Sequence, residues 1–226
     1  MCVPDSSSCV FRSFCILLGF FAVTNPAFSQ LSLVSSTPAN GATGVATLVT
    51  LTLEFSAPLD TTARFEEPED FFLGVEIFPS DSVGEPGGEI VLSPDFTTVT
   101  VPDLPLTPDT KFVLYLSGAR SASGAALDRP YALTFTTGSS LPAASVSGSV
   151  SFTGDNAGGT AVGLFTELPF GPGNDDNGDD DSGVDPEAVF VIPLNADNYT
   201  INFVPAGSYF VLGFKDINFD GKFDFL

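Results

Sequence analysis

The sequence contains no histidine and no tryptophan, and its three cysteines all fall within the first fifteen residues. Without histidine, neither a Ser-His-Asp triad nor a Cys-His pair can form, and His-ligated zinc and haem are excluded as well. Basic residues are scarce: 7 Lys and Arg stand against 28 Asp and Glu, for a formal net charge of −21. Such a charge repels phosphate backbones, so nucleic-acid binding is excluded. Solubility in salty media and cation binding both remain as explanations of the acidity.

The first 29 residues have the features of an export signal. Arg12 precedes the apolar run Phe14 to Val23, which is shorter than the roughly 20 residues of a membrane-spanning helix. Ala27 and Ser29 then occupy the −3 and −1 positions of a cleavage site. We predict a signal peptide over residues 1–29, with a buried N-terminal helix as the alternative. The mature chain would begin at Gln30 and would contain no cysteine. Because it then has no disulfide, its stability must come from apolar cores, with bound metal ions as a further source of stability.

After residue 30 the hydrophobic pattern is that of β-strands. From Val49 to Phe55, apolar residues alternate with Thr and Glu, so one face packs and the other meets water. Such runs recur at roughly 8–12-residue intervals between Pro, Gly and Asp clusters, which is typical of sandwiches and barrels. Strands are expected at residues 31–34, 49–55, 71–78, 89–92, 97–101, 111–116 and 131–136. The fold class is therefore all-β.

Four motifs in this region combine strand and turn signatures: Thr37 to Val45 (TPANGATGV), Leu53 to Asp60 (LEFSAPLD), Leu106 to Phe112 (LTPDTKF) and Tyr131 to Gly138 (YALTFTTG). Their chemistry is that of turns, because Asn40-Gly41 tolerates positive φ and Pro58 and Pro108 preset φ at strand ends. Together they resemble the bacterial Ig-like domain of the S-layer (SbsA) type, over about residues 31 to 138. Where many relatives carry an Asp and a Gly-Asn pair, this chain has Arg120 to Ala125 (RSASGA).

A second alternating series follows a linker at residues 140–143. Strands are expected at residues 145–152, 160–165, 188–194, 199–203 and 209–214. The string Tyr199 to Tyr209 (YTINFVPAGSY) is similar to a segment of the carboxypeptidase-regulatory or transthyretin-like β-sandwich. We predict two tandem β-sandwich (Ig-like) domains after the signal peptide, at residues 30–139 and 144–226. Five strands are fewer than the seven usual in the second family, so that sandwich is expected to be truncated.

The sharpest local motif is Asp216 to Asp224 (DINFDGKFD), which matches the opening of an EF-hand-type calcium loop. The expected ligands are the side chains of Asp216, Asn218 and Asp220, the carbonyl of Lys222, and Asp224 through water. The bidentate Glu of an EF-hand has no counterpart, and a strand precedes the loop. We predict calcium as the cofactor, with a solvated acidic turn as the alternative. A second acidic tract, residues 171–183, is expected to be a surface loop, with a second cation site as its alternative.

Catalysis is not expected from the remaining residues. The carboxylates of Glu66, Glu67, Glu69 and Asp70 are adjacent in one loop and do not form the opposed pair that a glycosidase needs. Most of the 23 Phe residues occupy alternating strand positions and are interpreted as core, such as Phe55, Phe112, Phe135 and Phe203. A carbohydrate-binding module is the alternative function, although such platforms usually present exposed Trp or Tyr.

The resemblance to the Ig-like family implies a non-catalytic module of the cell envelope or the medium, used as a spacer or adhesive unit. The expected location is secreted, cell-surface or periplasmic, without membrane insertion after signal cleavage. The expected partner is an unidentified protein or glycan at the cell surface. A further interpretation is that the chain is the N-terminal part of a longer surface protein, because it ends within the calcium motif.

Overall fold

The computed structural model describes residues 30–61, 75–116, 118–151, 159–168, 185–192 and 198–216. These ranges contain twelve β-strands and a single 3-10 turn, η1 (Ser80–Ser82). The all-β fold class is confirmed. None of the helical structure in these ranges is long and apolar enough to cross a membrane. The predicted signal peptide, residues 1–29, lies outside them.

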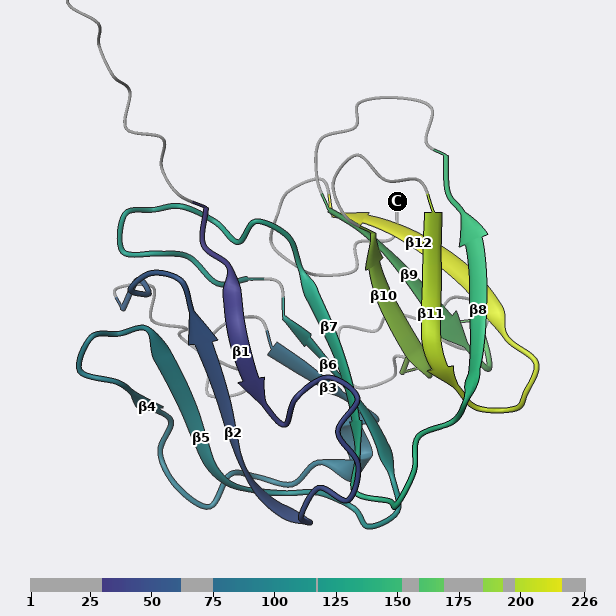
Figure 1. The fold of residues 1–226 in the computed structure, drawn as a ribbon, viewed down its shortest axis with the longest axis horizontal. Coiled ribbons are helices and arrows are strands. Elements are labelled where there is room, and N and C mark those ends of the chain that lie inside the picture. The colour runs from purple at the N-terminus through teal and green to yellow at the C-terminus, as the bar shows by residue number, and fades with distance from the viewer. Residues whose placement is uncertain are drawn as a thin grey trace, which may run out of the picture.

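The described residues of the N-terminal part form seven strands: β1 (Leu33–Thr37), β2 (Leu48–Phe55), β3 (Val75–Phe78), β4 (Val91–Leu92), β5 (Thr98–Pro105), β6 (Lys111–Leu116) and β7 (Tyr131–Thr136). They form two antiparallel sheets, in the orders β1-β2-β5-β4 and β3-β6-β7 (Figure 1). In β2 the alternation predicted from the sequence is observed: Leu51, Leu53 and Phe55 are buried, whereas Thr50 and Glu54 are exposed. The two sheets close over one apolar core, in which the rings of Phe112 and Phe135 stack.

Strand β5 is longer than expected. The sequence predicts an end before Pro102, but the strand continues to Pro105. Proline is tolerated there because β4 pairs with β5 only at Val99 and Thr100, so the missing N–H breaks no bond of that ladder. The register against β2 shifts nearby, and Asp103 adopts φ 50°, which bends the strand as a bulge does.

Two loops of the N-terminal part are held by side-chain hydrogen bonds. Gly41 adopts φ 83°, as its turn requires, and Asn40 Oδ1 accepts a 2.8 Å bond from the N–H of Thr134 on β7. In the loop where the chain departs from many relatives, Ser121 is buried and its Oγ accepts a 3.0 Å bond from Ala125 N–H. A serine hydroxyl therefore organises this loop.

Tyr131 ties the first strand to the last strand of the N-terminal part. Its hydroxyl donates to Asp128 Oδ1 over 2.7 Å and accepts from Leu33 N–H over 3.1 Å. The guanidinium of Arg129 lies 5.2 Å from the ring centroid, within the range of a cation–π contact. Burial and the bond to Asp128 raise the pKa of Tyr131, so the phenol stays protonated and keeps donating at neutral pH.

The C-terminal part contains β8 (Ala144–Ser149), β9 (Gly159–Phe165), β10 (Ala188–Ile192), β11 (Asn198–Val204) and β12 (Phe210–Asp216). They form the sheets β10-β9-β12 and β11-β8 around a separate apolar cluster of Val162, Leu164, Ala188, Ile201 and Val204. The expectation that Phe203 belongs to the core is wrong. It is half-buried because the β11 register is irregular between Ile201 and Val204, and Phe203 itself adopts φ 59°.

Candidate functional site

The predicted calcium loop begins where the described chain ends. Asp216 is the last residue of β12 and pairs with Gly159 of β9. The other four predicted ligands, Asn218, Asp220, Lys222 and Asp224, lie outside the described residues. The acidic tract 171–183 and the carboxylates at residues 66–70 lie outside them too.

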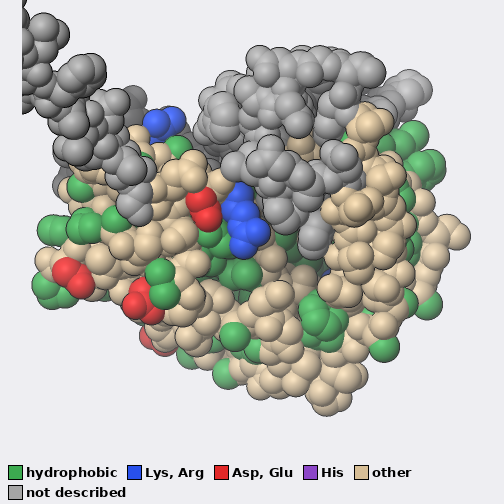
Figure 2. Space-filling model, turned by 45° about the horizontal axis from the view of Figure 1, so that its top comes forward, with side chains coloured by type: hydrophobic (Ala, Val, Ile, Leu, Met, Phe, Trp, Pro, Cys, Tyr) green, Lys and Arg blue, Asp and Glu red, His purple; other side chains and the backbone are tan. Residues whose placement is uncertain are grey.

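Acidic side chains do not gather in the part of the chain that the structure describes. It contains no group of three or more His, Cys, Asp or Glu that could hold a metal ion. On the face shown in Figure 2, the carboxylates are few, and one of them lies beside a Lys or Arg side chain. Half of the 28 acidic residues lie outside the described ranges.

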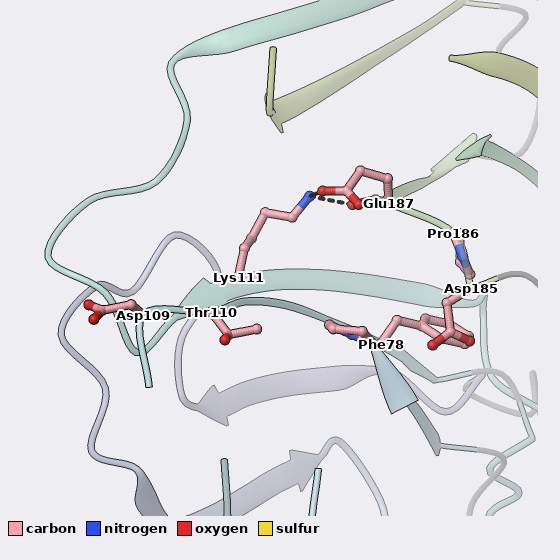
Figure 3. Close-up of a pocket in the computed structure, with 8 residues that line it drawn as sticks. Phe78, Asp109, Thr110, Lys111, Asp185, Pro186 and Glu187 are labelled. Carbon is pink, nitrogen blue, oxygen red and sulfur yellow. Dashed lines mark hydrogen bonds and ion pairs between the residues drawn. The ribbon is translucent and has the colours of Figure 1, made fainter. Parts of the chain in front are cut away.

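A pocket of about 290 Å³ lies where the two parts of the chain meet. The N-terminal part contributes the end of β3 and the turn before β6, and the C-terminal part contributes the segment before β10 (Figure 3). The lining residues are Phe78, Pro79, Asp109, Thr110, Lys111, Asp185, Pro186 and Glu187.

Lys111 is the central charge of this pocket. Its amine donates to the backbone carbonyl of Glu187, and Nζ lies 3.5 Å from Glu187 Oε1 (Figure 3). The lysine side chain is 12 % exposed and that of Glu187 is 37 % exposed. Burial lowers the pKa of Lys111, and the attraction and hydrogen bond of Glu187 oppose that shift without cancelling it. The ammonium is therefore less favourable here than in water, although it is paired.

A second polar contact involves Asp185, which also lines the pocket. Asp185 Oδ2 accepts two hydrogen bonds from Ser80 of η1, over 2.7 Å from the backbone N–H and 2.9 Å from the hydroxyl. In Figure 3 the carboxylate of Asp109 points away from Lys111. Polar contacts of Lys111 and Asp185 therefore join the two parts of the chain at two points beside this pocket.

A lysine of lowered pKa is a chemical candidate for a nucleophile or a base. Here, however, Nζ points at two oxygens of Glu187. That geometry holds the amine as a bridge between segments 76 residues apart in sequence. Lys111 belongs to no functional motif of the sequence. The available signal was the strand that follows it, Phe112 to Leu116, which is five apolar residues without alternation and so is typical of a strand buried on both faces.

Comparison with known families decides the class of the N-terminal part. The family described as bacterial Ig-like domain matches residues 28–137. Residues 28–137 belong to the bacterial Ig-like domain family. The seven strands and the single core between two sheets are those of this Ig-like domain, and the resemblance inferred from the four motifs is confirmed. The resemblance of residues 144–226 to a carboxypeptidase-regulatory sandwich stays a prediction.

Solved structures to which the chain is similar include three of one surface-layer protein. Surface layer protein SbsC, domains 1-6, is 16% identical with a TM-score of 0.31, over 53% of this chain and 15% of that chain. The S-layer protein rSbsC(31-844) is 16% identical with a TM-score of 0.30, over 52% and 15%. The N-terminal part of the bacterial S-layer protein SbsC is 12% identical with a TM-score of 0.30, over 77% and 44%.

The chain thus spans less than half the length of each of these structures. A search of curated proteins gave no match.

Proposed function

We propose that this protein is a non-catalytic structural module of the bacterial cell surface, serving as a spacer or adhesive unit. The observation that carries the proposal is the Ig-like domain over residues 28–137, a sandwich whose sheets pack on one core. Such sandwiches host many functions, so the choice among them must come from the side chains.

The perturbed side chains of the described ranges support a structural function. Hydrogen bonds from Ser93 and Thr97 lower the pKa of Asp95, which organises the turn between β4 and β5. Burial raises the pKa of Tyr209, with a smaller contribution from Glu187, and its hydroxyl donates to Pro205 within the turn before β12. With Tyr131 and Lys111, these groups each hold a turn or join two segments, and they do not meet at one reactive centre.

The location is tested by protease treatment of intact cells that produce the protein. A surface module is cleaved while the cells remain closed, whereas a cytoplasmic protein used as a marker survives. An antibody against the Ig-like domain follows the loss. If the chain becomes sensitive only after the cells are lysed, the surface assignment is wrong.

We also propose that the loop from Asp216 to Asp224 binds calcium. The spacing of Asp216, Asn218 and Asp220 places side-chain oxygens at alternate positions around a Gly-permitted turn. The end of β12 at Asp216 supplies a fixed starting point for that turn. Calcium at about 100 times its dissociation constant would add about 2.7 kcal/mol to stability, which raises the melting temperature by about 5–10 °C for a chain of this size.

The calcium proposal is tested by melting the full chain with calcium and with chelator. Asp220→Ala should abolish the shift, whereas Asp81→Ala, which removes a carboxylate from η1, should leave it unchanged. The proposal is wrong if the unaltered chain melts at the same temperature in millimolar calcium as in chelator.

A further inference from the structure

Strand β6 is buried on both of its faces. Phe112, Leu114 and Leu116 point into the core of the Ig-like domain. The residues between them, Val113 and Tyr115, belong to the opposite face, yet they are only 1% and 2% exposed. In an antiparallel sandwich that face commonly meets water. Something other than the domain's own core must therefore cover it.

The cover comes from the C-terminal part of the same chain. Val113 and Tyr115 form one buried apolar cluster with Ala161 of β9 and Val189 of β10. Phe78 of β3 and Ala132 of β7 pack against its edge, and we call these six residues the bridging cluster. Figure 1 shows β10 running beside β7 and the C-terminal sheets lying against the β3-β6-β7 side of the Ig-like domain.

Polar contacts lie beside the bridging cluster. Lys111 reaches across to Glu187, and Ser80 binds Asp185, so both cross-links join the Ig-like domain to the segment that leads into β10. The two parts also come close at the Asn40-Gly41 turn of the Ig-like domain. A Cβ added to Gly41 would lie 3.6 Å from Cζ of Phe203 on β11. At the end of the Ig-like domain, shortly before the linker, Gly138 O accepts a 2.7 Å bond from Gly44 N–H.

We propose that the outer face of the β3-β6-β7 sheet is a docking surface whose occupant is the C-terminal part of this chain, through its described residues in β9, β10 and the segment before β10. The Ig-like domain and the C-terminal part then form one rigid body at a fixed angle, and they are not two sandwiches on a flexible linker. Lys111 holds this interface together, because its apolar stem is buried and its amine binds Glu187 in the segment before β10. The proposal rests on these contacts and does not depend on a surface function.

The interface is tested by zero-length cross-linking of the full chain. A carbodiimide activates carboxylates and joins them to amines that lie within ion-pair distance, with the loss of one water per bond. At 3.5 Å from Glu187 Oε1, the amine of Lys111 should form an amide with the 185–187 segment, which mass spectrometry identifies after digestion. A Lys111 that links to other segments, or to none, overturns the proposal.

A variant that disrupts the bridging cluster tests whether the cross-link depends on docking of the two parts. Ala132→Glu places a charge at the edge of the bridging cluster, on a side chain that is half-buried, so the Ig-like domain should still fold. We expect the yield of the Lys111 cross-link to fall at least about tenfold, because a buried unpaired carboxylate disfavours the docked state. Ala46→Glu, at an exposed loop position, is the matched control and should keep the full yield. Equal yields in the two variants, with unchanged circular dichroism, would contradict docking.

Discussion

Replacing Val113 by alanine should lower the free energy of unfolding by about 2–3 kcal/mol. Val113 is 1% exposed and lies on the outer face of β6. The substitution removes two buried methyl groups, each worth about 0.8 kcal/mol of transfer free energy. The cavity left against Ala161 and Val189 adds about 1 kcal/mol more. For a chain of this size, the melting temperature should fall by about 5–10 °C.

Unfolding in urea, followed by far-ultraviolet circular dichroism, measures this change, since the chain has no tryptophan to report by fluorescence. Val91→Ala is the matched control, because Val91 is 55% exposed on β4 and its truncation should change stability by less than about 0.5 kcal/mol. The midpoint should shift without a change in slope. If Val113→Ala behaves like Val91→Ala, the outer face of β6 is solvated and the proposed docking is wrong.

Three further outcomes are expected. Tyr131→Phe should lose about 1–3 kcal/mol, since it removes a donor to Asp128 and leaves Leu33 N–H without that acceptor; urea titration of the variant measures it. Because burial lowers the pKa of Lys111 below 10.5, the folded state binds fewer protons than the unfolded state between that lowered value and 10.5. Wild type should therefore gain stability relative to Lys111→Met as pH rises through this window, in denaturation midpoints compared from about pH 7 to about pH 10; a difference that is flat or of opposite sign contradicts the burial of the ammonium. Gly124→Ala should cost about 1 kcal/mol, because Gly124 has φ 84° and open space around it, so strain is the only penalty; an unchanged midpoint would refute that conformation.

The strands were predictable because their patterns are local. Alternation in β2 and the Asn40-Gly41 turn follow from residues a few positions apart, and both are confirmed. The extension of β5 past Pro102 was not predictable, because it depends on how short β4 is and on the bulge that lets the strand continue. The irregular register near Phe203, which keeps this side chain only half-buried, was not predictable either, because the alternation of apolar and polar residues in the sequence does not indicate it.

The candidate site was less accessible from the sequence. Lys111 belongs to no motif, and its partner Glu187 comes from a segment 76 residues later, so only the tertiary fold brings them together. The uninterrupted apolar run after Lys111 predicts two buried faces but does not identify what covers the second. The calcium motif stays a prediction, because its residues after Asp216 lie outside the described ranges.

Hydroxyl-radical footprinting of the native full-length chain tests most directly whether the two parts form one body. Tyr115 is 2% exposed only if the C-terminal part covers the outer face of β6, whereas Phe96 is 45% exposed in the turn before β5 and serves as an internal reference. The account predicts that Tyr115 is oxidised at least about tenfold more slowly than Phe96, as expected for a side chain with almost no contact with solvent. Oxidation of Tyr115 at the rate of Phe96 would show an open face and contradict it.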